Sequence, residues 1–188
     1  LKSGEIGTPR HIRAQFGFNA GFNPASRLYD RALGGGGIMD VGGYPVSLAR
    51  LVAGAAVGRA FADPVTVKGS GIVGQSGVDE VAYGLLGFAG GFTAEVACAI
   101  ARTMDNRAVI EGDKGRIELV DPWVPGRNAG PSDATISVTV GGETRVEVLR
   151  SPQHLFAFEA ELFSRTIAEG ATEAPFPALS PADSLGNA

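Results

Sequence analysis

The sequence predicts an α+β domain, built on one open and predominantly antiparallel β-sheet with helices on one face. Strand-like segments follow one another from about residue 65 to residue 149, and helical periodicity is confined to the stretches before and after them. The turns between these segments are short and rich in glycine, which requires antiparallel neighbours. The 188 residues are also enough to bury the core of one domain of ordinary size.

The chain begins with a strand, a loop and a helix. Residues 11–19 alternate between apolar and polar side chains, which is typical of a half-buried strand. Its apolar face consists of Ile12, Ala14, Phe16 and Phe18. Residues 20–36 predict a loop, because they contain a proline and most of a run of four glycines. Apolar residues at helical spacing then predict a helix over residues 38–53, ended by Gly54 and kinked at Pro45.

The middle of the chain consists of strands and turns. The predicted strands are residues 65–75, 80–88, 92–101, 107–111, 116–120, 135–140 and 144–149. Glycines in the segments 89–91, 112–115 and 141–142 predict tight hairpins between them. Residues 121–133, which include Trp123, predict a surface loop. Because several of the strands are apolar almost throughout, we expect a partner subunit or a second domain to cover the other face of the sheet.

The two ends of the chain predict elements that continue beyond it. Residues 154–169 have a helical period, and a second helix begins at Ser180, followed by a proline and an acidic residue in its first turn. The first residues resemble the last turn of a helix, closed by Gly4. We therefore expect a fragment: residues 1–7 from a preceding domain, 8–179 as the α+β domain, and 180–188 as the start of a truncated helix.

Composition excludes several classes of function. The net charge is −4 and the 16 basic residues are scattered, so we expect neither nucleic acid nor a membrane as a partner. No apolar stretch approaches the roughly 20 residues of a membrane helix, and we expect a cytoplasmic protein. One cysteine, Cys98, and two histidines cannot form the usual protein-only zinc site. Cys98 lies in an apolar run and predicts a buried, inert thiol.

A candidate catalytic pair lies at the start of the first helix. Asp40 and Tyr44 are four residues apart, so their side chains project from the same helix face. An ionised carboxylate there is favoured by the helix dipole, and a phenol can exchange a proton with a substrate hydroxyl. The alternative is structural, with Asp40 as a plain helix cap and Tyr44 as a core aromatic. The glycine run itself is not a dinucleotide fingerprint, because no Gly-x-Gly-x-x-Gly follows a buried strand.

Three further residues are candidates for substrate binding. Arg13 and Asn19 lie on the polar side of the first strand, and Arg27 lies in the loop before the glycines. Each of them has ordinary solvated surface positions as its alternative. His154, at a predicted helix start, is interpreted as a capping or surface residue.

Residues 34–50, with the sequence GGGGIMDVGGYPVSLAR, resemble the signature helix of the Gfo/Idh/MocA oxidoreductases, in particular the dihydrodiol/xylose dehydrogenase and glucose–fructose oxidoreductase branch. Residues 1–7, 77–80, 111–115, 158–163 and 180–185 also fit that family. The resemblance implies the C-terminal α+β domain of a protein whose N-terminal Rossmann domain, absent here, binds NAD or NADP. It further implies that the open sheet face forms a homodimer or a higher oligomer.

The resemblance assigns roles that the residues alone leave open. By it, Asp40 orients the substrate and Tyr44 takes the role of a His or Tyr in proton transfer, while a lysine from a Glu-Lys-Pro motif of the missing domain assists. The implied reaction is NAD(P)-dependent hydride transfer on a sugar, diol or related polyol. This chain contains neither Glu-Lys-Pro nor the dinucleotide fingerprint, so alone we expect it to bind no cofactor and to be inactive. The alternative is a non-catalytic α+β module for binding or dimerisation.

Overall fold

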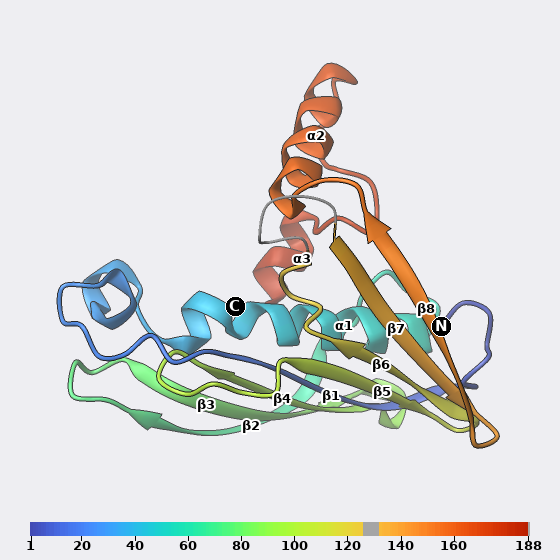
Figure 1. Ribbon diagram of the computed structural model, residues 1–188, viewed down its shortest axis with the longest axis horizontal. Coiled ribbons are helices and arrows are strands. Elements are labelled where there is room, and N and C mark those ends of the chain that lie inside the picture. Colours follow the sequence, from blue (N-terminus) through green and yellow to red (C-terminus); the bar gives the residue numbers. More distant parts are fainter. Residues whose placement is uncertain (126–131, 188) are drawn as a thin grey trace.

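The computed structural model describes residues 1–125 and 132–187, and it contains one eight-stranded sheet (Figure 1). The strands lie side by side in the order β2-β3-β4-β1-β5-β6-β7-β8. Their bounds are β1 Pro9–Gly17, β2 Pro64–Val73, β3 Asp79–Phe88, β4 Thr93–Ala99, β5 Arg107–Gly112, β6 Gly115–Val120, β7 Ser132–Val140 and β8 Glu143–Ser151. All neighbours are antiparallel except β1 and β4, which are parallel. The predicted fold class is confirmed.

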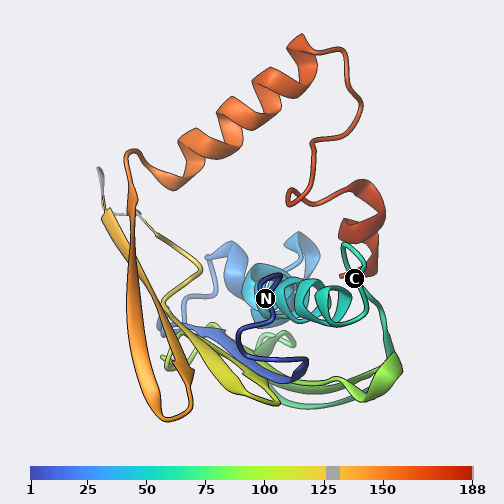
Figure 2. The same ribbon diagram turned by 90° about the vertical axis from the view of Figure 1, so that its right-hand side faces the viewer.

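The helices lie on one side of this sheet (Figures 1 and 2). A π-helix, η3 (Ile38–Gly42), leads directly into α1 (Gly43–Ala56), and α2 (Leu155–Ala168) and α3 (Pro181–Gly186) follow the last strand. Pro45 lies in the first turn of α1, directly after the π-helix, so an irregular helical segment precedes the proline. The kink predicted at Pro45 stays a prediction.

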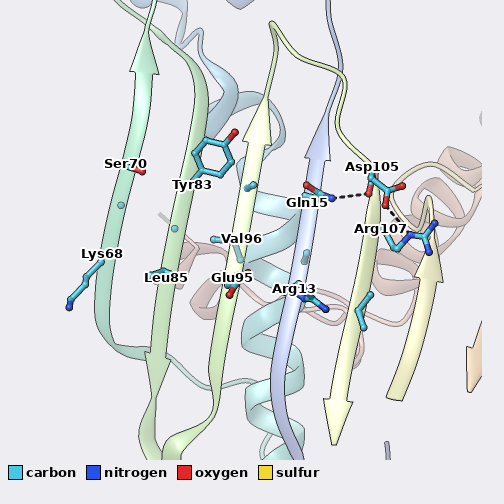
Figure 3. Close-up of a pocket in the computed structure, with 15 residues that line it drawn as sticks. Arg13, Gln15, Lys68, Ser70, Tyr83, Leu85, Glu95, Val96, Asp105 and Arg107 are labelled. Carbon is cyan, nitrogen blue, oxygen red and sulfur yellow. Dashed lines mark hydrogen bonds and ion pairs between the residues drawn. The ribbon is translucent and has the colours of Figure 1, made fainter. Parts of the chain in front are cut away.

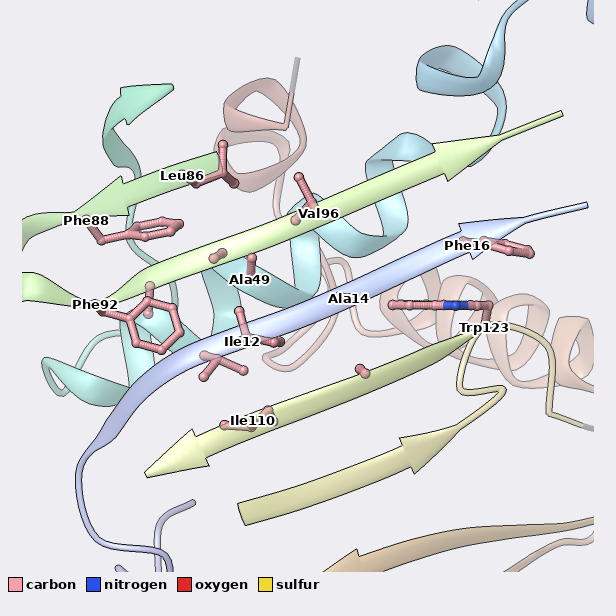
Figure 4. Packing of buried hydrophobic residues seen from close by; sticks show 14 of the residues in the cluster. Ile12, Ala14, Phe16, Ala49, Leu86, Phe88, Phe92, Val96, Ile110 and Trp123 are labelled. Carbon is pink, nitrogen blue, oxygen red and sulfur yellow. The ribbon is translucent and has the colours of Figure 1, made fainter. Parts of the chain in front are cut away.

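The core lies between α1 and the middle of the sheet (Figure 4). Strand register places an apolar row across five neighbouring strands, with each residue opposite the next. This row consists of Leu86, Ala94, Ile12, Ile110 and Ile117. Ala49, Val52 and Ala53 of α1 belong to the same cluster, and Ile12 is 0% exposed. The alternation that predicted a half-buried first strand therefore points its apolar residues toward α1.

The opposite face of the sheet carries mixed side chains. Register places a second row across it, which consists of Lys68, Leu85, Glu95, Arg13, Val109 and Glu118. A shallow cavity of about 650 Å³ runs over this face and is lined by Arg13, Lys68, Leu85 and Glu95 among others (Figure 3). We call this surface the open face.

The two ends of the chain pack onto the body. Residues 1–7 form turns instead of the helical turn that was predicted, and Ile6 is 1% exposed within the core. Helix α3 begins where predicted, with Ser180 as its cap. It is held against α1 by Arg50, a buried residue whose Nη1 donates to the Asp183 backbone oxygen at 2.7 Å. Helix α2 projects away from the sheet between these anchored segments (Figure 2).

Two features of the predicted loop over residues 121–133 differ from the prediction. Strand β7 already begins at Ser132, and Trp123 is buried within the chain, 9% exposed, instead of lying on the surface. Residues 126–131 lie outside the described part of the chain. None of the described helices combines the length and apolar character needed to cross a membrane.

Candidate active site

Asp40 lies on the π-helix that precedes α1, and a short loop brings a cation to it. The loop folds into two 3-10 turns, Arg27–Tyr29 and Arg31–Leu33, whose first N–H groups are capped by Ser26 and Asp30. This folding places Arg27 beside Asp40, and Arg27 Nη2 donates to Asp40 Oδ1 at 2.7 Å. The Asp40 side chain is 13% exposed and that of Arg27 is 66% exposed. The ion pair therefore covers the carboxylate from the solvent side with a largely exposed side chain.

Tyr44 lies in the first turn of α1 and is half exposed. Its ring meets two aromatic side chains edge-on: Phe16 of β1 at 5.3 Å and Trp123 at 6.3 Å between centroids. Trp123 in turn stacks on Phe16 at 5.8 Å with an interplanar angle of 14°, and its Nε1 donates to the Gln15 backbone oxygen at 2.8 Å (Figure 4). These contacts hold the Tyr44 ring by its sides and leave part of the residue accessible to a ligand.

The structure agrees neither with Asp40 as a plain helix cap nor with Tyr44 as a core aromatic residue. Asp40 makes no capping hydrogen bond to the helix; its carboxylate is paired with Arg27 instead. Tyr44 is 50% exposed and so is not a core aromatic. A carboxylate covered only by an exposed arginine and a half-exposed phenol, both from one helical segment, can respectively accept a hydrogen bond from a substrate hydroxyl and exchange a proton with another.

The candidate substrate-binding residues are distributed over different surfaces. Arg27 contacts Asp40 directly, as described. Asn19 is exposed just beyond the end of β1, where its Oδ1 accepts a hydrogen bond from the Gly21 N–H at 3.0 Å. Arg13, by contrast, lies on the open face, paired with Glu111 at 3.2 Å. Because Arg13 alternates with core residues that point toward α1, the structure does not bring it together with Asp40 and Tyr44.

Two residues contact Tyr44 although no pattern in the sequence assigned them a part in the site. Phe16 was assigned to the apolar face of its strand, which is correct, but its contact with Tyr44 depends on tertiary packing. Trp123 was interpreted as a surface residue, and no signal in the sequence connects it to a tyrosine on α1, 79 residues earlier. Their role in orienting Tyr44 is visible only in the folded chain.

Other candidate groups have structural roles. Cys98 is 4% exposed, and burial, together with the nearby carboxylate of Asp79, raises the pKa of its thiol to about 12. The prediction that this thiol is buried is confirmed. His154 caps α2, as one of the predicted interpretations had it, because its Nδ1 accepts from the Phe156 N–H at 3.3 Å. Within the described ranges, no cluster of three or more His, Cys, Asp or Glu side chains could hold a metal ion.

The glycine run does not fit a dinucleotide. A pyrophosphate binds the free N–H groups at the start of a helix. Here the Ile38 N–H, at the start of the π-helix, donates to Asp79 Oδ2 at 2.8 Å, so a carboxylate already occupies that position and would repel a phosphate. Helix α1 connects β1 to the parallel strand β2, but β4 and β3 lie between these two strands, so the unit differs from the strand–helix–strand unit of adjacent strands that binds a dinucleotide.

Comparison with known proteins agrees with the fold. Trans-1,2-dihydrobenzene-1,2-diol dehydrogenase from Mus musculus is 31% identical over 125 residues, which is 66% of this chain and 35% of the relative. An aldose-aldose oxidoreductase from Caulobacter crescentus, solved with glycerol, superposes with a TM-score of 0.77 at 25% identity, over 99% of this chain and 52% of the other. A 3-ketoreductase from Actinomadura kijaniata, in complex with NADP and TDP-benzene, gives a TM-score of 0.76 at 23% identity, over 100% of this chain and 53% of the other, and shows the fold alone.

These similarities first define a class: the chain is a C-terminal α+β domain of an oxidoreductase. Residues 1–118 match the family model described as GFO/IDH/MocA C-terminal domain. The chain belongs to the GFO/IDH/MocA family. It spans between about a third and about half of the length of the relatives that it matches.

Proposed function

We propose that this chain supplies the substrate-binding and proton-transfer groups of an NAD(P)-dependent dehydrogenase that acts on a sugar, a diol or a related polyol. The observation that carries the proposal concerns Asp40 and Tyr44: the first is paired with an exposed cation, and the second is held edge-on by two aromatic rings. The names of the diol dehydrogenases and the aldose oxidoreductase support the substrate class.

In this proposal each residue has one task. In the reducing direction the Tyr44 hydroxyl donates its proton to the carbonyl oxygen of the substrate as the hydride reaches the carbonyl carbon, and in the oxidising direction the same proton returns from the substrate hydroxyl to the Tyr44 oxygen. The Asp40 carboxylate accepts a hydrogen bond from a neighbouring hydroxyl and so orients the carbon that reacts. In this proposal another part of the enzyme holds the nicotinamide, since the glycine run of this chain does not fit a dinucleotide.

In this proposal the substrate enters by replacing Arg27 at the Asp40 carboxylate. Its guanidinium is 66% exposed, so a polyol with adjacent hydroxyls can replace it at the Asp40 carboxylate without leaving a buried cation unpaired. A substrate without a second hydroxyl offers no hydrogen bond to Asp40 and competes less well with Arg27. The pair thus favours a diol over a simple alcohol.

The open face is proposed as a homodimer interface. It carries apolar side chains such as Leu85, 55% exposed, between Lys68 and Glu95 of the same row. Opposite charges separated by apolar groups are self-complementary across a two-fold axis. Sedimentation velocity at micromolar concentration tests this: we expect a dimer that Leu85→Asp dissociates, and a monomeric wild-type chain would contradict it.

The catalytic proposal is tested in the full-length enzyme to which we assign this domain. We expect Tyr44→Phe to lower kcat by about 10²–10⁴-fold, because only the proton-transferring hydroxyl is removed. The matched control is Tyr83→Phe, since Tyr83 is also half exposed but its hydroxyl is paired with Arg102 beside the open face. Unchanged turnover in Tyr44→Phe would overturn the catalytic role.

Measurements on this chain alone distinguish the proposed enzyme domain from a non-catalytic module. We expect it to bind polyols, detected as shifts of the Tyr44 ring signals in NMR, and to show no turnover with NAD or NADP. Asp40→Asn should weaken this binding, because the neutral amide is a poorer hydrogen-bond acceptor. Dimer formation without any polyol binding would favour the module for dimerisation.

A further inference from the structure

The glycines before the π-helix leave space for one particular side chain. Gly36 has φ of +114°, and a Cβ on it would overlap Oδ1 of Asp79. A Cβ on Gly37 would lie 3.2 Å from Asp79 Oδ2 and 3.4 Å from the Cα of Ala99. The two glycines that immediately precede the π-helix are therefore the ones that admit the Asp79 carboxylate, which reaches them from the start of β3.

The admitted carboxylate makes a defined contact. Asp79 Oδ2 accepts a hydrogen bond from the Ile38 N–H at 2.8 Å, across a separation of 41 residues. Ile38 is the first residue of the π-helix, and its neighbour in the chain, Gly37, supplies no side-chain cap. Asp79 thus satisfies one of the N–H groups that a helix start leaves without an acceptor, in the role that a local N-cap residue usually has.

The same strand ends support the π-helix further along. A Cβ on Gly42 would lie 3.2 Å from the Cys98 Sγ of β4. Strands β3 and β4 are paired at this end through Ala82 and Cys98. The segment that carries Asp40 therefore contacts Asp79 at its start and Cys98 at its end, which belong to the neighbouring strands β3 and β4, and Tyr44 follows two residues later.

We propose that Asp79 is the positioning residue of this site: its hydrogen bond to the Ile38 N–H sets the orientation of residues 38–44, and hence of Asp40 and Tyr44, and glycine is required at 36 and 37 to admit it. Asp79 does not touch the substrate in this proposal. The importance of the two positioned groups rests on the proposed function, but the claim about their geometry does not.

The test compares Asp79→Ala, Asp79→Asn and a control, Asp113→Ala, in the 188-residue chain. Asp113 is a matched cap elsewhere in the fold, because its Oδ1 accepts the Thr8 N–H at 3.0 Å. The readouts are amide hydrogen exchange at Ile38 and the ¹³C signals of the Asp40 carboxyl and the Tyr44 ring. In Asp79→Ala we expect exchange at Ile38 to accelerate by about tenfold or more, and both side-chain signals to shift.

The other two variants make the test specific. Asp79→Asn keeps an acceptor oxygen of the same shape, so we expect it to restore the wild-type signals of Asp40 and Tyr44. Asp113→Ala should leave those signals unchanged, whatever stability it loses. Equal shifts in Asp79→Ala and Asp113→Ala, or no difference between Asp79→Ala and Asp79→Asn, would overturn the proposal.

A glycine variant keeps the proposal falsifiable if Asp79→Ala does not fold. Gly37 has helical angles, φ −66° and ψ −37°, so alanine is conformationally acceptable there and only crowding against Asp79 and Ala99 opposes it. We expect Gly37→Ala to shift the same Asp40 and Tyr44 signals, and wild-type signals would count against the proposal. None of these readouts uses turnover. Whether the Tyr44→Phe enzyme is inactive or unaltered, the result for Asp79 is therefore independent of the proposed function.

Discussion

The two faces of the sheet use the same strands for opposite purposes. On the face toward α1, register lines up a row of Leu86, Ala94, Ile12, Ile110 and Ile117, most of them buried. On the open face the corresponding row alternates charged and apolar side chains. Since neighbouring residues of a strand point to opposite faces, each strand contributes to both surfaces. The first face accounts for folding, and the second is available for association.

Each side of the sheet also has an arginine in an ion pair, and the two arginines differ in environment. Arg50 of α1 is 0% exposed and contacts Asp63, Asp183 and Asn187, with its guanidinium 4.7 Å from the Phe61 ring centre. Arg13 on the open face is 57% exposed and pairs with Glu111 alone. Burial makes the first pair expensive to break, whereas water and salt screen the second.

The largest effect is expected from Arg50→Met on the covered side. The substitution leaves the Asp183 carboxylate, 15% exposed, without its cation and releases α3 from α1. We expect a loss of about 3–5 kcal/mol in the free energy of unfolding, measured by urea denaturation. Proteolysis should then cleave first near residue 180. A variant as stable as the wild type would show that the buried pair is not what holds α3.

A second prediction concerns the burial of Cys98 on the face of the sheet that packs against α1. Because burial raises the pKa of this thiol to about 12, its alkylation at pH 8.5 should be on the order of a thousandfold slower than that of a free thiol. The pKa of the Cys98 thiol is higher in the folded chain than in the unfolded chain. Its contribution to the free energy of unfolding is therefore fully present below about pH 9 and is lost as the pH rises toward 12. Fast alkylation of the native chain would contradict this burial.

A third prediction compares two apolar residues on opposite faces. Ile12→Ala removes a side chain that is 0% exposed between the sheet and α1, and we expect a loss of about 3 kcal/mol. Leu85→Ala, 55% exposed on the open face, should cost less than about 0.5 kcal/mol at concentrations where the chain is monomeric. Urea denaturation followed by circular dichroism measures both. Equal losses would mean that the open face is packed within one chain.

The smallest effect is expected from the exposed ion pair. A double-mutant cycle with Arg13→Ala and Glu111→Ala should give a coupling of about 0.2–1 kcal/mol that decreases with added salt. The same cycle at Arg50 and Asp183 should give a clearly larger and less salt-sensitive coupling. If the two couplings were similar, the contrast between the two sides of the sheet would not depend on burial.

Local patterns were sufficient to predict most elements. The alternation around Ile12 predicted a half-buried strand, and β1 has that burial pattern. Glycine turns predicted the hairpins that join β3 to β4, β5 to β6 and β7 to β8. The Ser180 cap was predicted because a cap acts within one turn of chain. Each of these signals depends on residues close in sequence, which is why the sequence contains it.

The sequence by itself thus determined the fold class and most of the elements, because spacing along one strand or helix decides which side chains share a face. That Asp40 and Tyr44 act as a catalytic pair stays a prediction. Only the tertiary structure decided that β1 enters the sheet beside β4 in parallel, that Arg13 faces away from Asp40, and that Trp123 and Asp79 support the site. These outcomes depend on contacts between segments far apart in the chain. The energies of these contacts depend on which elements pack against each other when the core forms, and no local sequence pattern specifies that packing.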